Sequence, residues 1–293
     1  MRLLETTEIN GYRINGELRS DNAGNSIWGS ATKNGRKYFI KQLKETYYDI
    51  PYSQATVFQR EDMEASRKFY ERMKKLYALV KNSDNGNLIA PVEFIRKDGH
   101  YYLITEWVEQ SGTFGEIKNL PPPHRHVLMK VLAYSLCGLA GNNIIHNDLK
   151  PDNLCIKETA TGAKTLKIID FDNGFIQGDY PEIIGGSQSY MSPEVFIRTA
   201  QDEQGMEDRI DITPQSDIFS LGIIFHEILT GELPASSNPD IQYIGLAVGH
   251  GCPVKLHNGL NANYSDLIKK MLSVEPSERP SAEETFNILK RLG

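Results

Sequence analysis

The chain has 293 residues, of which 40% are hydrophobic, and its formal net charge is −6 at pH 7. This length allows one two-lobed domain or two small ones. The acidic balance, with basic residues interspersed among acidic ones, provides no basic surface for a polyanion and argues against a nucleic-acid partner.

Three cysteines, Cys137, Cys155 and Cys252, have no C-x-x-C spacing. Cys137 and Cys155 lie in apolar runs, which favours reduced core residues over disulfides or a zinc site and fits a cytoplasmic location. The first ten residues alternate charged and apolar side chains, so we expect neither a secretory signal nor a membrane anchor.

The first hundred residues are predicted to be β-rich with one long helix. Short β-branched and aromatic segments between Tyr12 and about Lys44 are broken by Asn-Gly at 15–16 and 34–35, which predicts hairpin turns. Residues 57–80 have apolar side chains at helical spacing and contain no Gly or Pro, so they are predicted to form a helix. Strands are expected at 92–96 and 101–106, joined by a turn.

The pattern changes to helices after the prolines at 121–123. Helices are predicted at 125–140, 217–230, about 264–272 and 281–291, and the last opens with a Ser281-x-x-Glu284 capping box. This change of architecture predicts an α+β fold with two lobes, at about 1–106 and 113–293, and a hinge at about 106–112.

One loop in the second half has the residues that phosphoryl transfer needs. It reads Ile144-Ile-His-Asn-Asp-Leu-Lys-Pro-Asp-Asn-Leu154 and places Asp148, Lys150 and Asn153 together after an apolar run. The reaction requires a carboxylate to orient the attacking hydroxyl, a cation near the moving phosphate and an oxygen ligand for Mg²⁺. The loop resembles the H-R-D-L-K-P-x-N catalytic loop of eukaryotic-like serine/threonine protein kinases. The resemblance implies catalytic roles for Asp148 and Lys150, metal binding by Asn153 and a structural role for His146.

A second motif follows at Leu166-Lys-Ile-Ile-Asp-Phe-Asp172 and resembles the strand that ends in D-F-G in this family. The resemblance implies that Asp170 is a further ligand of Mg²⁺, with Mn²⁺ as an alternative ion, and that Phe171 has a structural or regulatory role. Asp172 replaces the family's glycine, and we expect Asn173-Gly174 to supply the backbone freedom that Asp172 lacks. The D-F-D form is similar to compact bacterial members of the family.

The segment Lys37-Tyr-Phe-Ile-Lys41 resembles the family's V-A-I-K strand, which implies that Lys41 contacts the α- and β-phosphates of ATP. Lys44 is the competing lysine. Phe39 stands where the family has an alanine against the adenine ring, and Cys155 is expected to compensate for its bulk.

Three glutamates on the predicted helix 57–80 are candidates for the ion-pair partner of Lys41. We choose Glu64 and keep Glu61 and Glu71 as alternatives. Any of the three could instead be an exposed surface residue, which is the ordinary position of a glutamate.

The phosphate-binding loop aligns with Ser20-Asp-Asn-Ala-Gly-Asn-Ser-Ile27, in which Ser20, Asn22 and Asn25 replace the glycines of G-x-G-x-x-G-x-V. Asparagine tolerates a left-handed backbone, so a turn over the phosphates remains the expectation, with Ile27 at the valine position. An ordinary hairpin turn is the alternative.

The strand that ends at Thr105 leads into Glu106-Trp107-Val108, which resembles the hinge that binds adenine through its backbone. Thr105 occupies the gatekeeper position, and Glu106 and Val108 are the expected hinge contacts.

The segment Gly186-Ser-Gln-Ser-Tyr-Met-Ser-Pro-Glu194 resembles the protein-kinase G-T-x-x-Y-M-A-P-E element, which small-molecule kinases typically lack. Ser187 stands at the threonine position that contacts the catalytic loop. Asp217 is expected to hold the backbone of that loop, and Arg279 to form a buried bidentate pair with Glu194.

Two departures concern regulation. Asn147 replaces the arginine that receives the activation-loop phosphate in many kinases, which predicts activity without phosphorylation of that loop. The acidic stretch 199–213 is predicted to be a solvated loop, with a preference for basic substrates as the alternative.

The resemblance extends from about Tyr12 to Leu292 and implies a single bilobal protein-kinase domain. We expect it to use ATP and Mg²⁺ to phosphorylate serine or threonine in a protein substrate, as a monomer with no membrane contact. Separate partner proteins are expected to regulate it, because no sensor is evident. The alternatives are a nucleotide-binding pseudokinase scaffold and a small-molecule kinase.

Overall fold

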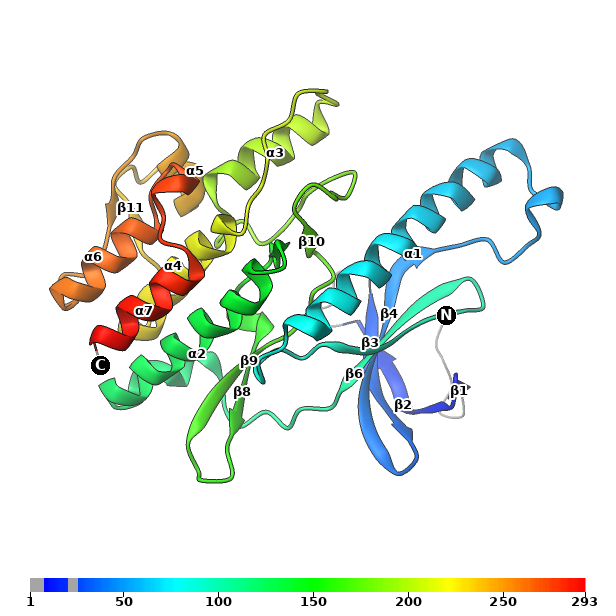
Figure 1. Cartoon of the computed structure of the whole chain (residues 1–293), viewed down its shortest axis with the longest axis horizontal. Coiled ribbons are helices and arrows are strands. Elements are labelled where there is room, and N and C mark those ends of the chain that lie inside the picture. Colours follow the sequence, from blue (N-terminus) through cyan, green and yellow to red (C-terminus); the bar gives the residue numbers. More distant parts are fainter. Residues whose placement is uncertain (1–7, 21–25, 293) are drawn as a thin grey trace. The chain divides into compact units, whose positions relative to one another are not determined.

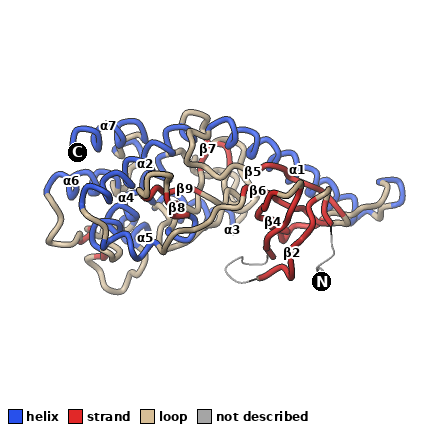
Figure 2. Tube along the Cα trace, turned by 90° about the horizontal axis from the view of Figure 1, so that it is seen from below, coloured by secondary structure: helices blue, strands red, loops and turns tan. Residues whose placement is uncertain are grey.

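The computed structural model describes residues 8–20 and 26–292, and the chain divides into two compact units (Figure 1). Unit 1 comprises Met1–Lys81 and Ile89–Glu109, and unit 2 comprises Asn82–Leu88 and Gln110–Gly293. Unit 1 is a sheet with one long helix, whereas unit 2 is mainly helical (Figure 2). Within the described ranges, no helix is long and apolar enough to cross a bilayer.

Unit 1 contains a six-stranded antiparallel sheet with strand order β1-β2-β3-β4-β6-β5. The strands are β1 (Glu8–Ile9), β2 (Tyr12–Arg19), β3 (Ile27–Lys33), β4 (Arg36–Thr46), β5 (Pro91–Lys97) and β6 (His100–Glu106). A short 3₁₀ turn, η1 (Tyr52–Gln54), precedes the long helix α1 (Val57–Ser83), whose last two residues belong to unit 2. The predicted strands and the predicted helix of this half are therefore confirmed.

Hairpin turns in unit 1 use Asn-Gly or Asp-Gly pairs with positive φ, as two-residue turns require. Asn34-Gly35 joins β3 to β4 with φ of 51° and 73°, and Asp98-Gly99 joins β5 to β6 with φ of 49° and 77°. The turn predicted at Asn15-Gly16 was wrong. Gly16 has φ 79° inside β2, where the pairing with β3 shifts register, so its left-handed backbone forms a bulge instead.

The two faces of this sheet have different coverings. One face buries an apolar cluster formed by Ile9, Tyr12, Ile14, Ala31, Ile40, Tyr102 and Ile104. The other face packs against α1, where the ring of Tyr70 stacks on Phe94 at 5.4 Å and the Tyr101 hydroxyl donates to the Ser66 carbonyl at 3.0 Å. Side chains alternate between the faces along each strand, so register decides which residues lie on the α1 face.

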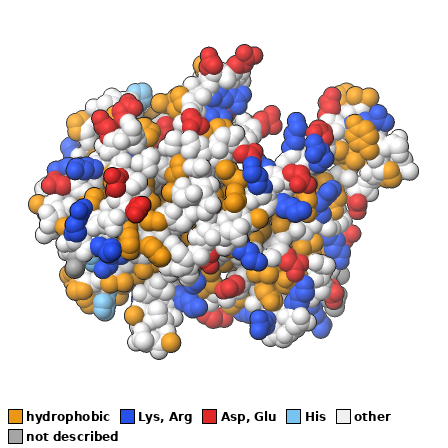
Figure 3. Space-filling model, viewed as in Figure 1, with side chains coloured by type: hydrophobic (Ala, Val, Ile, Leu, Met, Phe, Trp, Pro, Cys, Tyr) orange, Lys and Arg blue, Asp and Glu red, His pale blue; other side chains and the backbone are white. Residues whose placement is uncertain are grey.

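The beginning of α1 is not covered in this way. Phe58 is 80% exposed, Val57 68% and Tyr52 60%. Hydrophobic side chains accordingly gather at the surface where α1 begins (Figure 3; compare Figure 1).

The longer elements of unit 2 are helices, and its strands have at most five residues in the described part of the chain. Its helices are η2 (Phe114–Asn119), α2 (Pro122–Ala140), η3 (Pro151–Asn153), α3 (Pro193–Glu203), α4 (Gln215–Thr230), α5 (Ile244–Gly249), α6 (Ala262–Met271), η4 (Pro276–Glu278) and α7 (Ala282–Leu292). Three antiparallel pairs join β7 (Ile144–Ile145) to β10 (Phe175–Ile176), β8 (Leu154–Glu158) to β9 (Lys164–Ile168), and β11 (Ala235–Ser236) to β12 (Val254–Lys255). The four predicted helices are confirmed as α2, α4, α6 and α7, whereas α3 and α5 were not predicted.

Helix α4 is the centre of unit 2 because it is buried along most of its length. It contacts α2 and α6, and a Cβ added at Gly222 would lie 3.0 Å from the Cβ of Met271 in α6, so a larger residue there would push the helices apart. Gly231, with φ 81°, ends α4 in a left-handed cap. The capping box that starts α7 is present as predicted, with the Ser281 amide donating to Glu284 at 2.7 Å.

Candidate active site

The loop between β7 and η3, residues 146–150, is held by the first turn of α4. Asp217 is buried there and accepts hydrogen bonds from the backbone amides of His146 at 2.7 Å and Asn147 at 3.0 Å. Burial raises the pKa of Asp217, although His146 and the two amides act in the opposite direction. Asp217 thus contacts the loop backbone as the sequence predicted.

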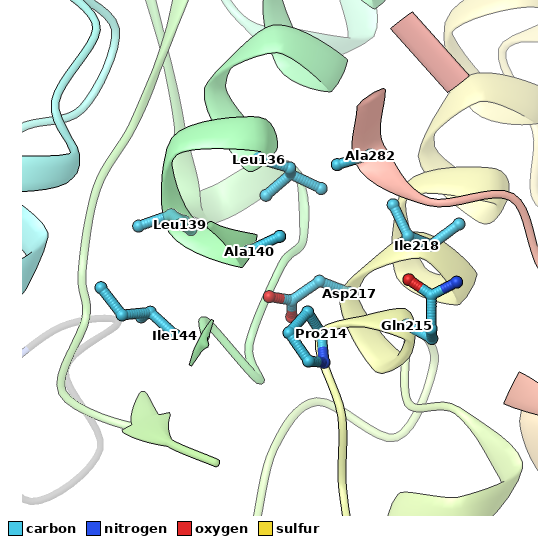
Figure 4. Close-up of a pocket in the computed structure, with 9 residues that line it drawn as sticks. All are labelled: Leu136, Leu139, Ala140, Ile144, Pro214, Gln215, Asp217, Ile218 and Ala282. Carbon is cyan, nitrogen blue, oxygen red and sulfur yellow. The ribbon is translucent and has the colours of Figure 1, made fainter. Parts of the chain in front are cut away.

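A small pocket lies beside Asp217, between the end of α2 and the start of α4 (Figure 4). Leu136, Leu139 and Ile218 line it with apolar groups. It has room for about one water molecule, so it is part of the packing behind the loop and not a nucleotide site.

The carboxylate of Asp148 is surrounded by donors and is only 7% exposed. Its Oδ2 accepts from Lys150 Nζ at 2.9 Å and from Asn153 Nδ2 at 3.1 Å, while its Oδ1 accepts from the Ser187 amide at 3.0 Å. Burial alone would raise the pKa of Asp148, but the bonds from Lys150 and Ser187 outweigh it and hold the pKa below its ordinary value. The group is therefore a fixed, ionised carboxylate at neutral pH.

Lys150 links this carboxylate to the segment that resembles a peptide-docking element. Its ammonium donates to Ser187 Oγ at 2.7 Å as well as to Asp148. The predicted contact of Ser187 with the loop is therefore present, through both its hydroxyl and its amide.

The second predicted motif, residues 166–172, is hydrogen-bonded to the loop and to η3. The Ile169 amide donates to the Asn153 carbonyl at 3.0 Å, and His146 Nε2 donates to the Ile169 carbonyl at 3.0 Å. Phe171 is buried with its ring centroid 4.8 Å from that of His146. Asp170 lies between Ile169 and Phe171, so both of its neighbours in the chain contact His146.

The backbone of this motif differs from our expectation. Within its described residues, the left-handed conformation is recorded for Asp170, with φ 62°, and not for Asp172. The Gly174 amide then closes a turn on the Phe171 carbonyl at 3.0 Å. Asp172 consequently does not need the backbone freedom of the glycine that it replaces.

The donor set in unit 2 suits Mg²⁺. Asn153 uses its side-chain nitrogen in both bonds to Asp148, at 2.7 Å to the carbonyl and 3.1 Å to the carboxylate, so its Oδ1 is the atom that can coordinate a cation. Asp170 adds a carboxylate. An amide oxygen and a carboxylate are hard ligands of the kind that Mg²⁺ takes alongside phosphate oxygens. Among the described residues, no group of three or more His, Cys, Asp or Glu side chains forms a denser metal site.

Glu194 and Arg279 form the predicted bidentate pair. Nη1 and Nη2 of Arg279 donate to the two carboxylate oxygens of Glu194 at 2.6 and 2.8 Å, and both side chains are buried. The guanidinium also donates to the Ser273 carbonyl at 2.8 Å. This pair ties the start of α3 to the turn before α7.

In unit 1, register places Lys41 on the α1 face of the sheet. Lys41 pairs with Leu103 of β6, and Leu103 pairs with Phe94 of β5, which packs against α1. Lys41 is 9% exposed. Phe39 and Thr105, which pair with each other, lie on the same face as Lys41.

The residue opposite Lys41 in β3 is Trp28, not Ile27. Ile27 pairs with Gln42 and so lies on the other face, which corrects the predicted valine position by one residue. The ring of Trp28 stacks on Phe39 with centroids 5.6 Å apart. Sequence alignment missed Trp28, although counting back from the two-residue turn at 34–35 gives this pairing.

Glu64 has a different partner from the predicted one. Its carboxylate accepts two bonds from Arg67 on the same helix, at 2.7 and 3.0 Å, and it lies at the surface. Hydrogen bonding to Arg67 lowers the pKa of Glu64. Glu61 and Glu71 are exposed as well. The face that α1 turns to the sheet is aromatic and apolar, which accounts for the exposed position of all three glutamates.

The remaining predicted nucleotide residues are distributed as follows. Ser20 is exposed at the end of β2, whereas Asn22 and Asn25 lie outside the described residues. Glu106 is exposed and Val108 half-buried. Between them, Trp107 is held by Lys37, whose Nζ lies 3.7 Å from the ring centroid.

Cys155 is buried in β8 of unit 2, and burial raises the pKa of its thiol. It therefore behaves as an apolar core residue. Its predicted compensation for Phe39, a residue of unit 1, stays a prediction.

A two-unit chain with an antiparallel sheet, a helical unit and an Asp–Lys–Asn loop has the architecture of a phosphotransferase of the protein-kinase class. A family model described as the protein kinase domain matches residues 55–288. The chain therefore belongs to the protein kinase domain family, which confirms the predicted family and fold. The match begins after β4, so it does not include Lys41.

Three relatives illustrate the likeness. Serine/threonine-protein kinase ATG1c of Arabidopsis thaliana is 28% identical over 76% of this chain and 30% of its own length. Calcium and calcium/calmodulin-dependent serine/threonine-protein kinase of Pisum sativum is 35% identical over 50% of this chain and 26% of its own length. Serine/threonine-protein kinase pkn2 of Myxococcus xanthus is 26% identical over 95% of this chain and 32% of its own length.

The chain thus spans about a third of the length of these relatives. Among solved structures, the kinase of the Cydia pomonella granulovirus is similar, with a TM-score of 0.65 and 21% identity over 96% of this chain and 93% of that chain. This likeness supports the fold.

Proposed function

We propose that this chain transfers the γ-phosphate of Mg·ATP to serine or threonine hydroxyls of a protein substrate. The observation that carries the proposal is the fixed carboxylate of Asp148, which accepts bonds from Lys150, Asn153 and the Ser187 amide. A carboxylate held in this way can orient an incoming hydroxyl, and the family membership of the chain supplies the reaction class.

In this mechanism the substrate oxygen forms a bond to the γ-phosphorus while the bond from that phosphorus to the bridging oxygen of ADP breaks. Asp148 accepts the hydroxyl proton, and the Lys150 ammonium stabilises the negative charge of the transferred group. Bound Mg²⁺ would neutralise charge on the phosphates, held by Asn153 and Asp170. Lys41 is assigned to the α- and β-phosphates by the resemblance of its strand.

Serine/threonine acceptors are favoured because Lys150 bridges Asp148 and Ser187, with bonds of 2.9 and 2.7 Å. The names of the relatives agree, since each is a serine/threonine-protein kinase. The segment around Ser187 supports a protein acceptor over a small molecule.

The same proposal includes activity without phosphorylation of the segment around Ser187, at Tyr180, Ser187 or Ser189. The side-chain amide of Asn147 donates directly to the Gly185 carbonyl at 2.5 Å, so the loop and the segment are linked without a phosphate. We expect phosphatase treatment of the purified chain to leave its activity unchanged. A large loss of activity after that treatment would contradict this part of the proposal.

The test is Mg·ATP-dependent phosphate incorporation into a generic basic protein, followed by mapping of the labelled residues. Asp148→Asn should lower kcat by about 10²–10⁴-fold and leave ATP binding intact, because it removes the proton acceptor while keeping the shape. Asp152→Asn is the matched control, since Asp152 is exposed and lies in η3, directly after the loop. Asp170→Ala should remove the Mg²⁺ dependence of ATP binding.

Incorporation onto serine or threonine that is lost in Asp148→Asn and kept in Asp152→Asn supports the proposal. Mg²⁺-dependent ATP binding with no incorporation by the wild-type chain would instead identify a nucleotide-binding scaffold. Label on a small-molecule acceptor alone would identify a small-molecule kinase.

A further inference from the structure

The acidic stretch 199–213 is more than the solvated loop that its composition predicts. Helix α3 ends at Glu203, and the chain then returns to the core, where Ile212 is fully buried. Glu203, Glu207 and Asp208 are exposed, and acidic side chains gather at this end of α3 (Figure 3). Asp202 differs from these neighbours because its side chain is inaccessible to solvent.

Asp202 is neutralised by two arginines. Its Oδ1 accepts from Arg198 Nε at 2.9 Å and from Arg209 Nη1 at 2.9 Å. We call Arg198, Asp202 and Arg209 the Asp202 cluster. A buried carboxylate between two guanidinium groups is fixed in position, since moving it would leave charges unpaired in the interior.

The other oxygen of Asp202 binds the segment before Ser187. Its Oδ2 accepts from the Ile184 amide at 3.0 Å, and the Thr199 hydroxyl donates to the Ile184 carbonyl at 2.8 Å. Both polar groups of the Ile184 backbone are therefore bound to α3, and the Ile184 side chain is fully buried.

A second attachment lies four residues earlier, at Tyr180. Its hydroxyl donates to the Asp211 carboxylate and accepts from the Ile212 amide at 3.2 Å. The Arg198 guanidinium lies 4.4 Å from the centroid of the Tyr180 ring, so the cluster and this attachment share one residue.

These attachments continue to the candidate active site through consecutive residues. Ile184 precedes Gly185, whose carbonyl accepts from Asn147, and Ser187 donates its amide to Asp148. A Cβ at Gly186 would come within 2.7 Å of the Asn147 carbonyl, so the backbone is in close contact with the loop here. Residues 180–187 are thus fixed to α3 and to residues 211–212 at one end and to Asp148 at the other.

We propose that the Asp202 cluster positions residues 180–187 for docking of the protein substrate, so that Asp202 is a positioning residue for the acceptor and not for ATP. This inference rests on the proposed function. In this proposal the buried cluster orders residues 180–187 through its hydrogen bond to the Ile184 backbone.

Asp202→Asn removes the charge and keeps the shape. We expect the KM for the protein acceptor to rise on the order of 10-fold or more, since a hydrogen bond to a charged group is stronger than one between neutral groups. The KM for ATP should stay within about twofold, because the contacts of Asp202 reach the acceptor segment. Glu203→Gln is the matched control, with the same charge change one residue away on the exposed side of α3.

Thr199→Val is a milder variant that removes the bond to the Ile184 carbonyl without leaving a buried charge unpaired. It should raise the acceptor KM less than Asp202→Asn does. It keeps the test decisive if Asp202→Asn fails to fold.

Hydrogen–deuterium exchange gives a readout that does not depend on activity. Amides of residues 180–187 should exchange faster in both variants, while those of α4 stay protected as in the wild type. Unchanged exchange and unchanged acceptor KM in both variants would overturn the inference, as would an equal rise in both KM values. A wild-type chain without activity would overturn the proposed function, and faster exchange would then support the ordering role of the cluster alone.

Discussion

The face of the unit 1 sheet around Lys41 and the loop around Asp148 in unit 2 depart from the family pattern to different degrees. On the sheet, Trp28 stacks on Phe39, and Phe39 stands at the position where the family has an alanine. In the loop, Asp148, Lys150 and Asn153 match the family and bind one another at hydrogen-bond distance. The family match likewise begins only at residue 55.

The difference follows from the kinds of interaction in each place. A polar network depends on particular donor and acceptor atoms, so one changed side chain leaves a buried partner unsatisfied. An apolar surface depends on shape and volume, and residues of other sizes can fill it when their neighbours change as well. The residues of the unit 2 loop are therefore easier to find in the sequence than those of the Lys41 face of unit 1.

The largest effect on stability should come from the buried ion pair of unit 2, and the exposed pair of unit 1 is its comparison. Arg279→Met in unit 2 leaves Glu194 buried without its partner and should lower the free energy of unfolding by about 3–5 kcal/mol. Chemical denaturation of both proteins measures this difference. A loss below about 1 kcal/mol would mean that Glu194 finds another partner or reaches solvent.

The matched change in unit 1 is Glu64→Gln, which breaks the exposed pair with Arg67. We expect no measurable change in the unfolding midpoint or in kcat, because water replaces the lost contact. A marked drop in kcat would instead show that Glu64 serves Lys41, as the sequence-based prediction had it.

A smaller effect should appear as a pH dependence that belongs to unit 2. Buried His226 accepts from the His257 amide at Nε2 (3.0 Å) and therefore donates from Nδ1 to the Glu232 carbonyl (2.8 Å), which keeps it neutral. Burial lowers the pKa of His226. The unfolded chain thus binds a proton first, and stability should fall as the pH drops below about 6.5.

Unfolding by urea at about pH 7.5 and about pH 5.5 measures this loss, and His226→Gln should reduce it because glutamine does not titrate. His126, whose pKa is also lowered by burial, accounts for part of what remains. A loss of stability equal in wild type and variant would exclude His226 as the source.

The smallest change should be spectroscopic and concerns unit 1. The chain has two tryptophans, so Trp107→Phe leaves Trp28 as the only one. Because Trp28 lies on the same face as Lys41, its emission should change when Mg·ATP binds. Lys41→Met in the same background should weaken the response. Unchanged emission while binding is detected by another method would place the nucleotide away from this face.

Much of the fold could be predicted because apolar periodicity reports burial directly. The long helix α1 and the helices α2 and α4 follow from it. The turn predicted at Asn15-Gly16 was wrong because a left-handed glycine suits a bulge as well as a turn, and only the partner strand decides between them. Helix α5 has six residues, two of them glycines, and so gives a weak helical signal.

The candidate site could be predicted where residue identity is fixed by chemistry, as at Asp148, Asp217 and Arg279. It could not be predicted where the phase of an element decides. A one-residue error at Ile27 moves a side chain to the other face of a strand, and the rotation of α1 places Glu64 at the surface. The Asp202 cluster was missed because composition does not distinguish a buried acid from its exposed neighbours.

The residues with left-handed backbone limit which substitutions the chain can accept without losing a functional side chain. Among the described residues, the non-glycine positions with positive φ are all asparagine or aspartate, and they include Asn147 and Asp170. Glycine would adopt this conformation with about 1 kcal/mol less strain than asparagine or aspartate. It would, however, remove the amide that binds Gly185 and the carboxylate next to Phe171. At these two positions, a change to glycine should therefore relieve backbone strain and lose a side chain of the candidate active site at the same time.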